Sequence, residues 1–183
     1  MQSFTQRMIG AAKLQVPTYE EVEHDKSATG QAAIVVVLAA LAAGIGALGG
    51  GSIGALFLTA IASLLGWLIW AAIIWAVGTK LLPEAQTEAD VGQLLRTLGF
   101  AAAPGLLRVF GFIPVLGPIL LLVVYVWMLA TMVVAVRQAL DYNSTGRAIG
   151  VCLIGWLAQL LILALLGGAA SLGMGGPSPA PAV

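Results

Sequence analysis

The chain has 183 residues, of which 60% are hydrophobic and 9% are charged, and its mean hydropathy is +1.02. This composition excludes an ordinary soluble domain and is typical of a transmembrane helical bundle. Eight basic residues balance eight acidic ones, so the net charge gives no reason to expect a nucleic-acid partner. The single cysteine, Cys152, excludes an intrachain disulfide and a cysteine-based metal site.

Residues 1–30 precede the first apolar run and are predicted to form two short helices on the cytoplasmic side. Residues 3–14 have the pattern of an amphipathic helix lying at the interface, in which Arg7 reaches the lipid headgroups. Thr18 and Glu21 have the spacing of a capping box, which predicts that an acidic helix starts at Thr18. Because a long polar stretch comes first, no cleavable signal peptide is expected.

Five apolar segments follow, each near the length of about 20 residues that a spanning helix requires. The third is the least regular, because charged residues and a proline interrupt it. The predicted fold is all-α: a polytopic integral membrane bundle, residues 31–168, with a flexible tail rich in glycine and proline at residues 169–183. The five predicted spans are 31–49, 53–78, 94–113, 115–136 and 147–168.

The basic residues are distributed unevenly between the two ends of this bundle. With five spans, Arg108 lies toward one end, and every other lysine and arginine belongs to the opposite end. The positive-inside rule then predicts a cytoplasmic N-terminus and an external C-terminus. Omitting the third span would move Arg137 and Arg147 to the external side, so the charge distribution favours five spans. We expect a multi-pass protein of a bacterial-type plasma membrane, embedded in the lipid bilayer.

The third span combines a helix break with a cation. Gly99, Phe100, Pro104, Gly105 and Arg108 form this candidate membrane site. A charge at the bilayer centre costs about 2.5–3.5 kcal/mol, so it normally pairs or faces a polar cavity. Two interpretations stay open. Either Arg108 extends to the external headgroups, or its guanidinium and the freed backbone groups form a pocket for an anion, as in transporters with discontinuous helices.

Acidic residues gather on the predicted cytoplasmic side, in residues 20–25 and in the loop after the second span. These residues form a candidate interaction surface. A divalent cation between the two groups is conceivable, since hard cations prefer several carboxylate oxygens, but solvated helix ends are the plainer interpretation and no metal is expected. The residues of this surface are Glu20, Glu21, Glu23, His24, Asp25, Glu84, Glu88, Asp90 and Arg96.

From Val91 onward, the order of several motifs resembles the Yip domain family, membrane proteins named for interaction with Ypt/Rab GTPases. The matching motifs are Leu94-Leu95-Arg96, Gly99-Phe100-x-x-x-Pro104, Ile113-Pro114, Trp127 and the turn from Leu140 to Ile149. The resemblance covers residues 88–166 and is to a compact prokaryotic relative. It implies five spans with a cytosolic N-terminus and an external C-terminus. For such relatives the resemblance indicates a fold and a membrane location more than an activity.

No nucleophile–base arrangement and no phosphate-binding loop is present, so neither an enzyme nor a cofactor is expected. We therefore predict a non-catalytic membrane-organising or adaptor role. The partner would be a membrane protein, a cytoplasmic protein or a second copy of the chain. The alternative is a small transporter or channel for a solute or ion, which would use the broken third span around Pro104, Gly105 and Arg108.

Overall fold

The computed structural model describes residues 2–47 and 52–173, and no strand occurs among them. Two short helices, α1 (Phe4–Ala12) and α2 (Val16–His24), come first and form what we call the N-terminal helix pair. Five segments long and apolar enough to cross a membrane follow, which confirms the predicted all-α, five-span architecture. These segments are α3 (Ala28–Gly46), α4 (Ile53–Ala76) with the π-helical η1 (Val77–Leu81), α5 (Val91–Ala101) with the 3₁₀-helical η2 (Ala103–Phe112), α6 (Leu116–Ala139) and α7 (Thr145–Gly173).

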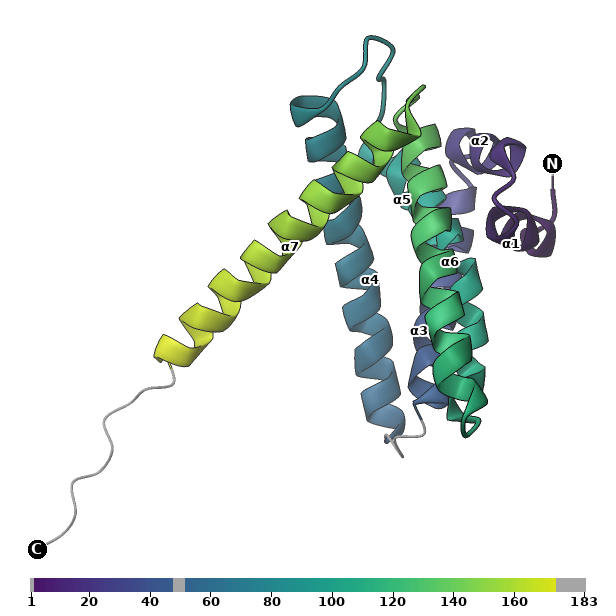
Figure 1. Cartoon of the computed structure of the whole chain (residues 1–183), viewed down its shortest axis with the longest axis vertical. Helices are drawn as coiled ribbons and strands as arrows, with labels where there is room; N and C mark the ends of the chain where they lie inside the picture. The colour runs from purple at the N-terminus through teal and green to yellow at the C-terminus, as the bar shows by residue number, and fades with distance from the viewer. Residues whose placement is uncertain (1, 48–51, 174–183) are drawn as a thin grey trace, which may run out of the picture.

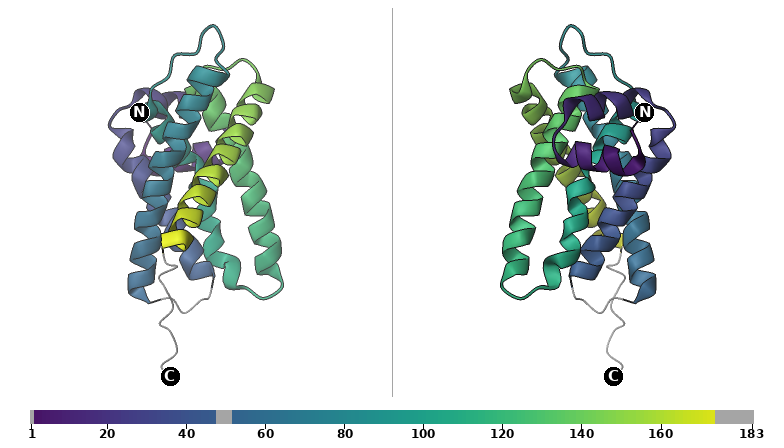
Figure 2. Two further views of the ribbon diagram at one scale, coloured as in Figure 1. Left: turned by 90° about the vertical axis from the view of Figure 1, so that its left-hand side faces the viewer. Right: turned by 90° about the vertical axis from the view of Figure 1, so that its right-hand side faces the viewer.

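The N-terminal helix pair, the loop between η1 and α5 and the turn between α6 and α7 all lie at one end of the molecule, uppermost in Figure 1 and again in both views of Figure 2. We call this the N-terminal end of the bundle. The Tyr142 hydroxyl lies 2.7 Å from the Leu82 carbonyl oxygen, and Arg147 pairs with Glu84 at 3.4 Å. The five-span topology predicts this grouping. That this end faces the cytoplasm stays a prediction.

The N-terminal helix pair packs against the bundle through aromatic side chains. The rings of Phe4 and Phe100 meet edge to face with centroids 6.3 Å apart. The Trp127 indole nitrogen donates to the Ala12 carbonyl at 2.7 Å, and the hydroxyl of the fully buried Tyr19 lies 3.4 Å from the Thr131 carbonyl oxygen on α6. The apolar face of α1 is therefore directed at the protein interior.

The third span, α5 followed by η2, lies unusually close to α3. Ala32, Ala39 and Gly46 recur every seven residues along α3 and face this span. A Cβ atom on Gly99 would lie 2.7 Å from the Ala32 Cβ atom, and one on Gly46 would lie 1.8 Å from the Arg108 carbonyl oxygen. Small residues at such positions let two helix backbones approach each other, which is how membrane helices gain packing energy without a hydrophobic driving force.

Several predicted boundaries differ from the observed ones. Helix α2 begins at Val16 with Pro17 in its first turn, and no side chain caps it, so the predicted capping box at Thr18 is wrong. Proline fits the first helical turn without a cap because it has no N–H group to satisfy. Helix α7 runs to Gly173, beyond the predicted end of the span at residue 168, and residues 174–183 of the predicted tail lie outside the described residues.

We expect Gly99→Ala to destabilise the folded protein by about 1–3 kcal/mol, because the new methyl group must push α5 away from α3. Gly66→Ala in α4 is the matched control, since a Cβ atom there has nothing within 4 Å. Thermal unfolding in detergent measures both. Equal midpoints for the two variants would show that the close α3–α5 contact does not limit stability.

Candidate functional site

The backbone carbonyls at the helix break in the third span, between α5 and η2, accept hydrogen bonds from donors within the protein. Helix α5 ends at Ala101, where the freed carbonyl accepts a hydrogen bond of 2.8 Å from the Thr131 hydroxyl on α6. The Ala102 carbonyl accepts from the Gly105 amide at 2.9 Å. Ion and substrate sites in discontinuous helices use such freed backbone groups as ligands. Here the groups are engaged within the protein.

Arg108 is half-buried and is held by the same span and by α3. Its Nε atom donates to the Gly105 carbonyl at 3.1 Å, and its Nη2 atom donates to the Ala39 carbonyl at 2.8 Å. Because both nitrogens donate to backbone carbonyls, this arrangement gives no support to the anion-pocket interpretation, while the extension of the half-exposed side chain to the external headgroups stays a prediction. The residue joins η2 to α3, beside the small-residue contact described above.

A cavity of about 510 Å³ opens among the spans, but it is apolar. Its lining comes from α3 to α7, and its polar members are few, with the Gln159 amide on α7 the most polar side chain. Arg108 does not line it. None of the five residues of the predicted candidate membrane site lines this cavity, and Gly99 and Gly105 lie against α3 instead. Residues lining the cavity include Val36, Trp67, Trp70, Met128, Trp156 and Gln159.

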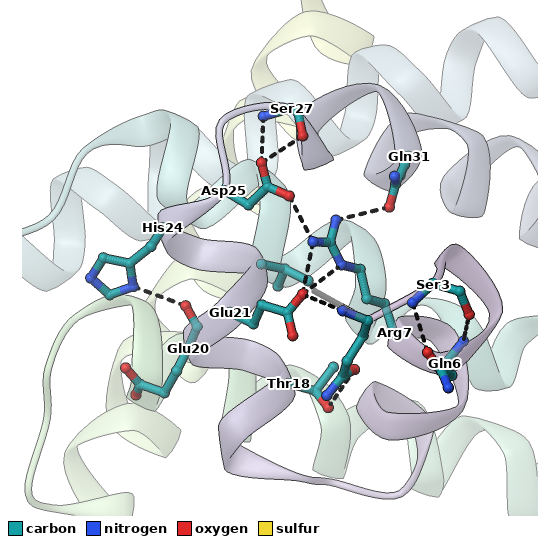
Figure 3. A network of polar contacts seen from close by, with 12 residues as sticks. Ser3, Gln6, Arg7, Thr18, Glu20, Glu21, His24, Asp25, Ser27 and Gln31 are labelled. Atoms are coloured by element: carbon teal, nitrogen blue, oxygen red, sulfur yellow. Dashed lines mark hydrogen bonds and ion pairs between the residues drawn. The ribbon is translucent and has the colours of Figure 1, made fainter.

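Arg7 joins α1 to α2 and α3 at the N-terminal end of the bundle (Figure 3). It is only 2% exposed, and its guanidinium donates to Glu21 at 2.8 Å, Asp25 at 2.6 Å and Gln31 at 3.1 Å. The hydrogen bond from Arg7, followed by that from the Gln2 amide, lowers the pKa of Glu21. The prediction that Arg7 reaches the lipid headgroups is wrong, because its guanidinium is buried and binds two carboxylates within the protein.

Arg96 lies in the protein interior and closes the C-terminal end of α2. It is 5% exposed, and its Nε atom lies 3.0 Å from the Val22 carbonyl oxygen and 2.9 Å from that of Glu23, to which Nη2 also donates. The last carbonyls of a helix have no partner within it, and a cation there also interacts favourably with the helix dipole. Placing Arg96 on an interaction surface was therefore wrong; it fastens α2 to α5.

Glu23 is also buried, at 2% exposure, which corrects its predicted place on the surface. One carboxylate oxygen, Oε1, accepts a hydrogen bond of 3.1 Å from the Gln93 amide. The other, Oε2, is buried without a hydrogen-bond partner among the described residues. Burial, then the charge of Asp141 and that of Glu20, raises the pKa of Glu23 to about 7. The sequence shows no signal for this burial, because Glu23 belongs to a run of charged residues.

The remaining residues of the predicted surface fall into two groups. Glu84 and Asp90 have structural roles: Glu84 accepts from the Asn143 amide at 2.9 Å, and Asp90 caps α5 by accepting from the Gln93 amide at 2.8 Å. His24 and Glu88 are exposed and Glu20 is half-exposed. Glu21 and Asp25 are held by Arg7, as described above. The accessible part of the predicted surface is thus much smaller than its nine residues.

The five apolar spans and the docked N-terminal helix pair define a polytopic helical membrane protein. A family model for the Yip1 domain matches residues 14–166, so the chain belongs to the Yip1 domain family. The match begins before α2 and includes the first two spans, which the motif resemblance from residue 88 onward did not cover. Comparison with curated proteins and with solved structures gives no match.

Replacing Arg96 by methionine is expected to destabilise the protein by about 2 kcal/mol or more, because the buried carbonyls of Val22 and Glu23 lose their charged donor. The variant should also be cut faster by trypsin at Lys26, which is exposed between α2 and α3. Arg147→Met is the control, since that side chain is 42% exposed. Identical unfolding and cleavage of the two variants would contradict a fastening role for Arg96.

Glu23 should make stability fall as the pH rises. Its folded-state pKa is about 7, above the unfolded value of 4.5, so its contribution is complete below 4.5 and is lost as the pH passes through about 7. The groups that face it are Asp141, Glu20, His24 and Arg96. In chelator-containing buffer, wild type should lose up to about 3 kcal/mol between pH 5 and pH 8 relative to Glu23→Gln. Parallel stability curves for these two proteins would contradict the raised pKa.

Proposed function

We propose that this Yip1-domain protein acts non-catalytically, as an adaptor that holds a protein partner at the membrane surface. The observation that supports this most is the fastening of the N-terminal helix pair: Arg7 ties α1 to α2 and α3, and Arg96 ties α2 to α5. The pair is therefore a preformed surface at the end of the bundle. A surface that is already ordered binds without the entropic cost of ordering a tail.

The neighbouring loops extend this surface. The Gln86 amide donates to the Asp141 carbonyl at 2.9 Å, so the loop before α5 and the turn before α7 are joined to each other. Exposed side chains of both signs lie at this end of the bundle, among them Lys26 between α2 and α3, Glu88 before α5 and Arg147 at the start of α7. Charges of both signs on one face favour a partner with a complementary charge pattern. Such complementarity contributes more to the specificity of binding than to its affinity. We propose that this face lies in the cytoplasm of a bacterial-type cell.

The alternative, transport through the broken third span, has weaker support. The carbonyl groups that the break releases have donors, and the Arg108 guanidinium donates to two backbone carbonyls. The cavity among the spans is apolar. Permeation of an ion or polar solute requires polar groups that replace its hydration shell.

Photo-crosslinking tests the adaptor proposal in native membranes. A photo-reactive amino acid is placed at position 24 or 88, and, as a control, at the exposed Ser52 just before α4, at the opposite end of the bundle. We expect positions 24 and 88 to give the same discrete protein adduct and position 52 to give none. Charge reversal by Glu88→Lys should remove the adduct formed at position 24. Adducts with lipid alone at all three positions would contradict the proposal.

Proteoliposomes decide between the two functions. If the purified protein alone moved an ion or a polar solute across the bilayer, and Arg108→Ala abolished that flux while Arg108→Lys retained part of it, the transporter would replace the adaptor. We expect no flux above that of empty liposomes. Correct folding of both Arg108 variants is checked by their unfolding midpoints, because the residue also joins η2 to α3.

A further inference from the structure

Three potential metal ligands stand together at the end of α2. One carboxylate oxygen of Glu20, one of Glu23 and one ring nitrogen of His24 all lie within 4.8 Å of one another. The three residues have the spacing i, i+3 and i+4, which places them on one face of the helix. Asp141, in the turn before α7, adds further negative charge near Glu23.

The buried carboxylate of Glu23 independently indicates that this cluster binds a ligand. Its Oε2 atom has no hydrogen-bond partner among the described residues, although the side chain is almost completely buried. The nearby Arg96 does not satisfy it, because that guanidinium donates to backbone carbonyls. A buried acceptor without a donor destabilises the folded protein, and an ion that is bound there is one of the recognised explanations.

His24 is oriented as metal-binding histidines commonly are. Its Nδ1 atom lies 2.9 Å from the Glu20 carbonyl oxygen, and the two are joined in Figure 3. A carbonyl oxygen can only accept, so Nδ1 carries a proton and, in the neutral ring, Nε2 carries the lone pair. A histidine that ligates a metal through one nitrogen usually donates the other N–H group to a carboxylate or a backbone carbonyl.

We propose that Glu20, Glu23 and His24 bind a divalent transition-metal ion, with Zn²⁺ the best match to two carboxylates and an imidazole. Ligands around one zinc ion stand roughly 3–4 Å apart, given metal–ligand distances of about 2.0–2.2 Å. Glu23 is fixed by burial, while the exposed His24 and the half-exposed Glu20 can rotate to bring Nε2 and a carboxylate oxygen to these distances. Water completes the coordination on the exposed side. This site does not depend on the proposed adaptor function.

The single histidine of the chain makes a direct test possible. The full chain, without a histidine tag, is labelled with ¹⁵N-histidine, purified in detergent and stripped of metal with a chelator. Zn²⁺ is then added while the ring nitrogen signals are followed, so that every change comes from His24. We expect one Zn²⁺ per chain and a shift of the Nε2 signal. Mg²⁺ and Ca²⁺ at the same concentration should leave the ring signals unchanged, because both prefer oxygen ligands.

Two conservative variants identify the carboxylates. Glu23→Gln and Glu20→Gln should each weaken Zn²⁺ binding at least about tenfold, since loss of even an outer partner of a metal site has an effect of that size. Glu88→Gln, at an exposed carboxylate outside the cluster, should bind as wild type does. Glutamine preserves the size of the side chain and an acceptor for Gln93, and the unfolding midpoints show whether each variant is folded.

Three results would overturn the proposal: an unshifted His24 ring at millimolar Zn²⁺, an equal shift with Mg²⁺ or Ca²⁺, or Zn²⁺ affinity that neither glutamine variant changes. The result is also distinguishable from that of the crosslinking experiment. A partner adduct can form whether or not Zn²⁺ binds, and Zn²⁺ can bind to a protein that has no partner.

Discussion

Backbone carbonyls released at helix ends and breaks must find donors inside the protein, and the architecture of this chain depends on how it meets that requirement. Arg96 donates to the last carbonyls of α2, and the Thr131 hydroxyl donates to the last carbonyl of α5. Arg108 donates to the Gly105 carbonyl and to a backbone carbonyl of α3. Apart from the Arg108–Gly105 bond within η2, each of these bonds also joins two elements that are separate in the sequence. The hydrogen bonds that satisfy the carbonyls therefore also hold the bundle together. This is the main role of Arg96 and Arg108, the arginines that stand out in the sequence.

The same requirement explains why the N-terminal helix pair belongs to the membrane domain. Its last carbonyls accept hydrogen bonds from Arg96 of α5, and its own Arg7 donates to Gln31 of α3. The Yip1 domain match likewise begins at residue 14, just before α2. An interfacial helix that lies on lipid would be free to move; one held by a buried guanidinium is a fixed part of the surface, and that is why the adaptor proposal rests on this pair.

Some features of the site were predictable and others were not, for identifiable reasons. The motif drew attention to Gly99, Phe100 and Pro104, and the structure places Gly99 against Ala32 of α3 and Phe100 against Phe4 of α1. The burial of Glu23 and Arg96 could not be predicted, because both lie in charged segments that read as solvated helix ends. Propensity and pattern describe a residue's neighbours in the chain, whereas burial depends on elements that pack from elsewhere.

The sequence by itself determined the number of spans, the all-helical class and the loops that share an end, because hydropathy and the distribution of basic residues act locally along the chain. Only the tertiary structure decided what the charged residues do. Arg96 meets Glu23 across 73 positions of sequence, and Arg108 meets Ala39 across 69. Where water is excluded, each guanidinium must donate to a carbonyl of the protein. Which carbonyl lies within reach depends on how the small residues pack, and therefore on the tertiary structure.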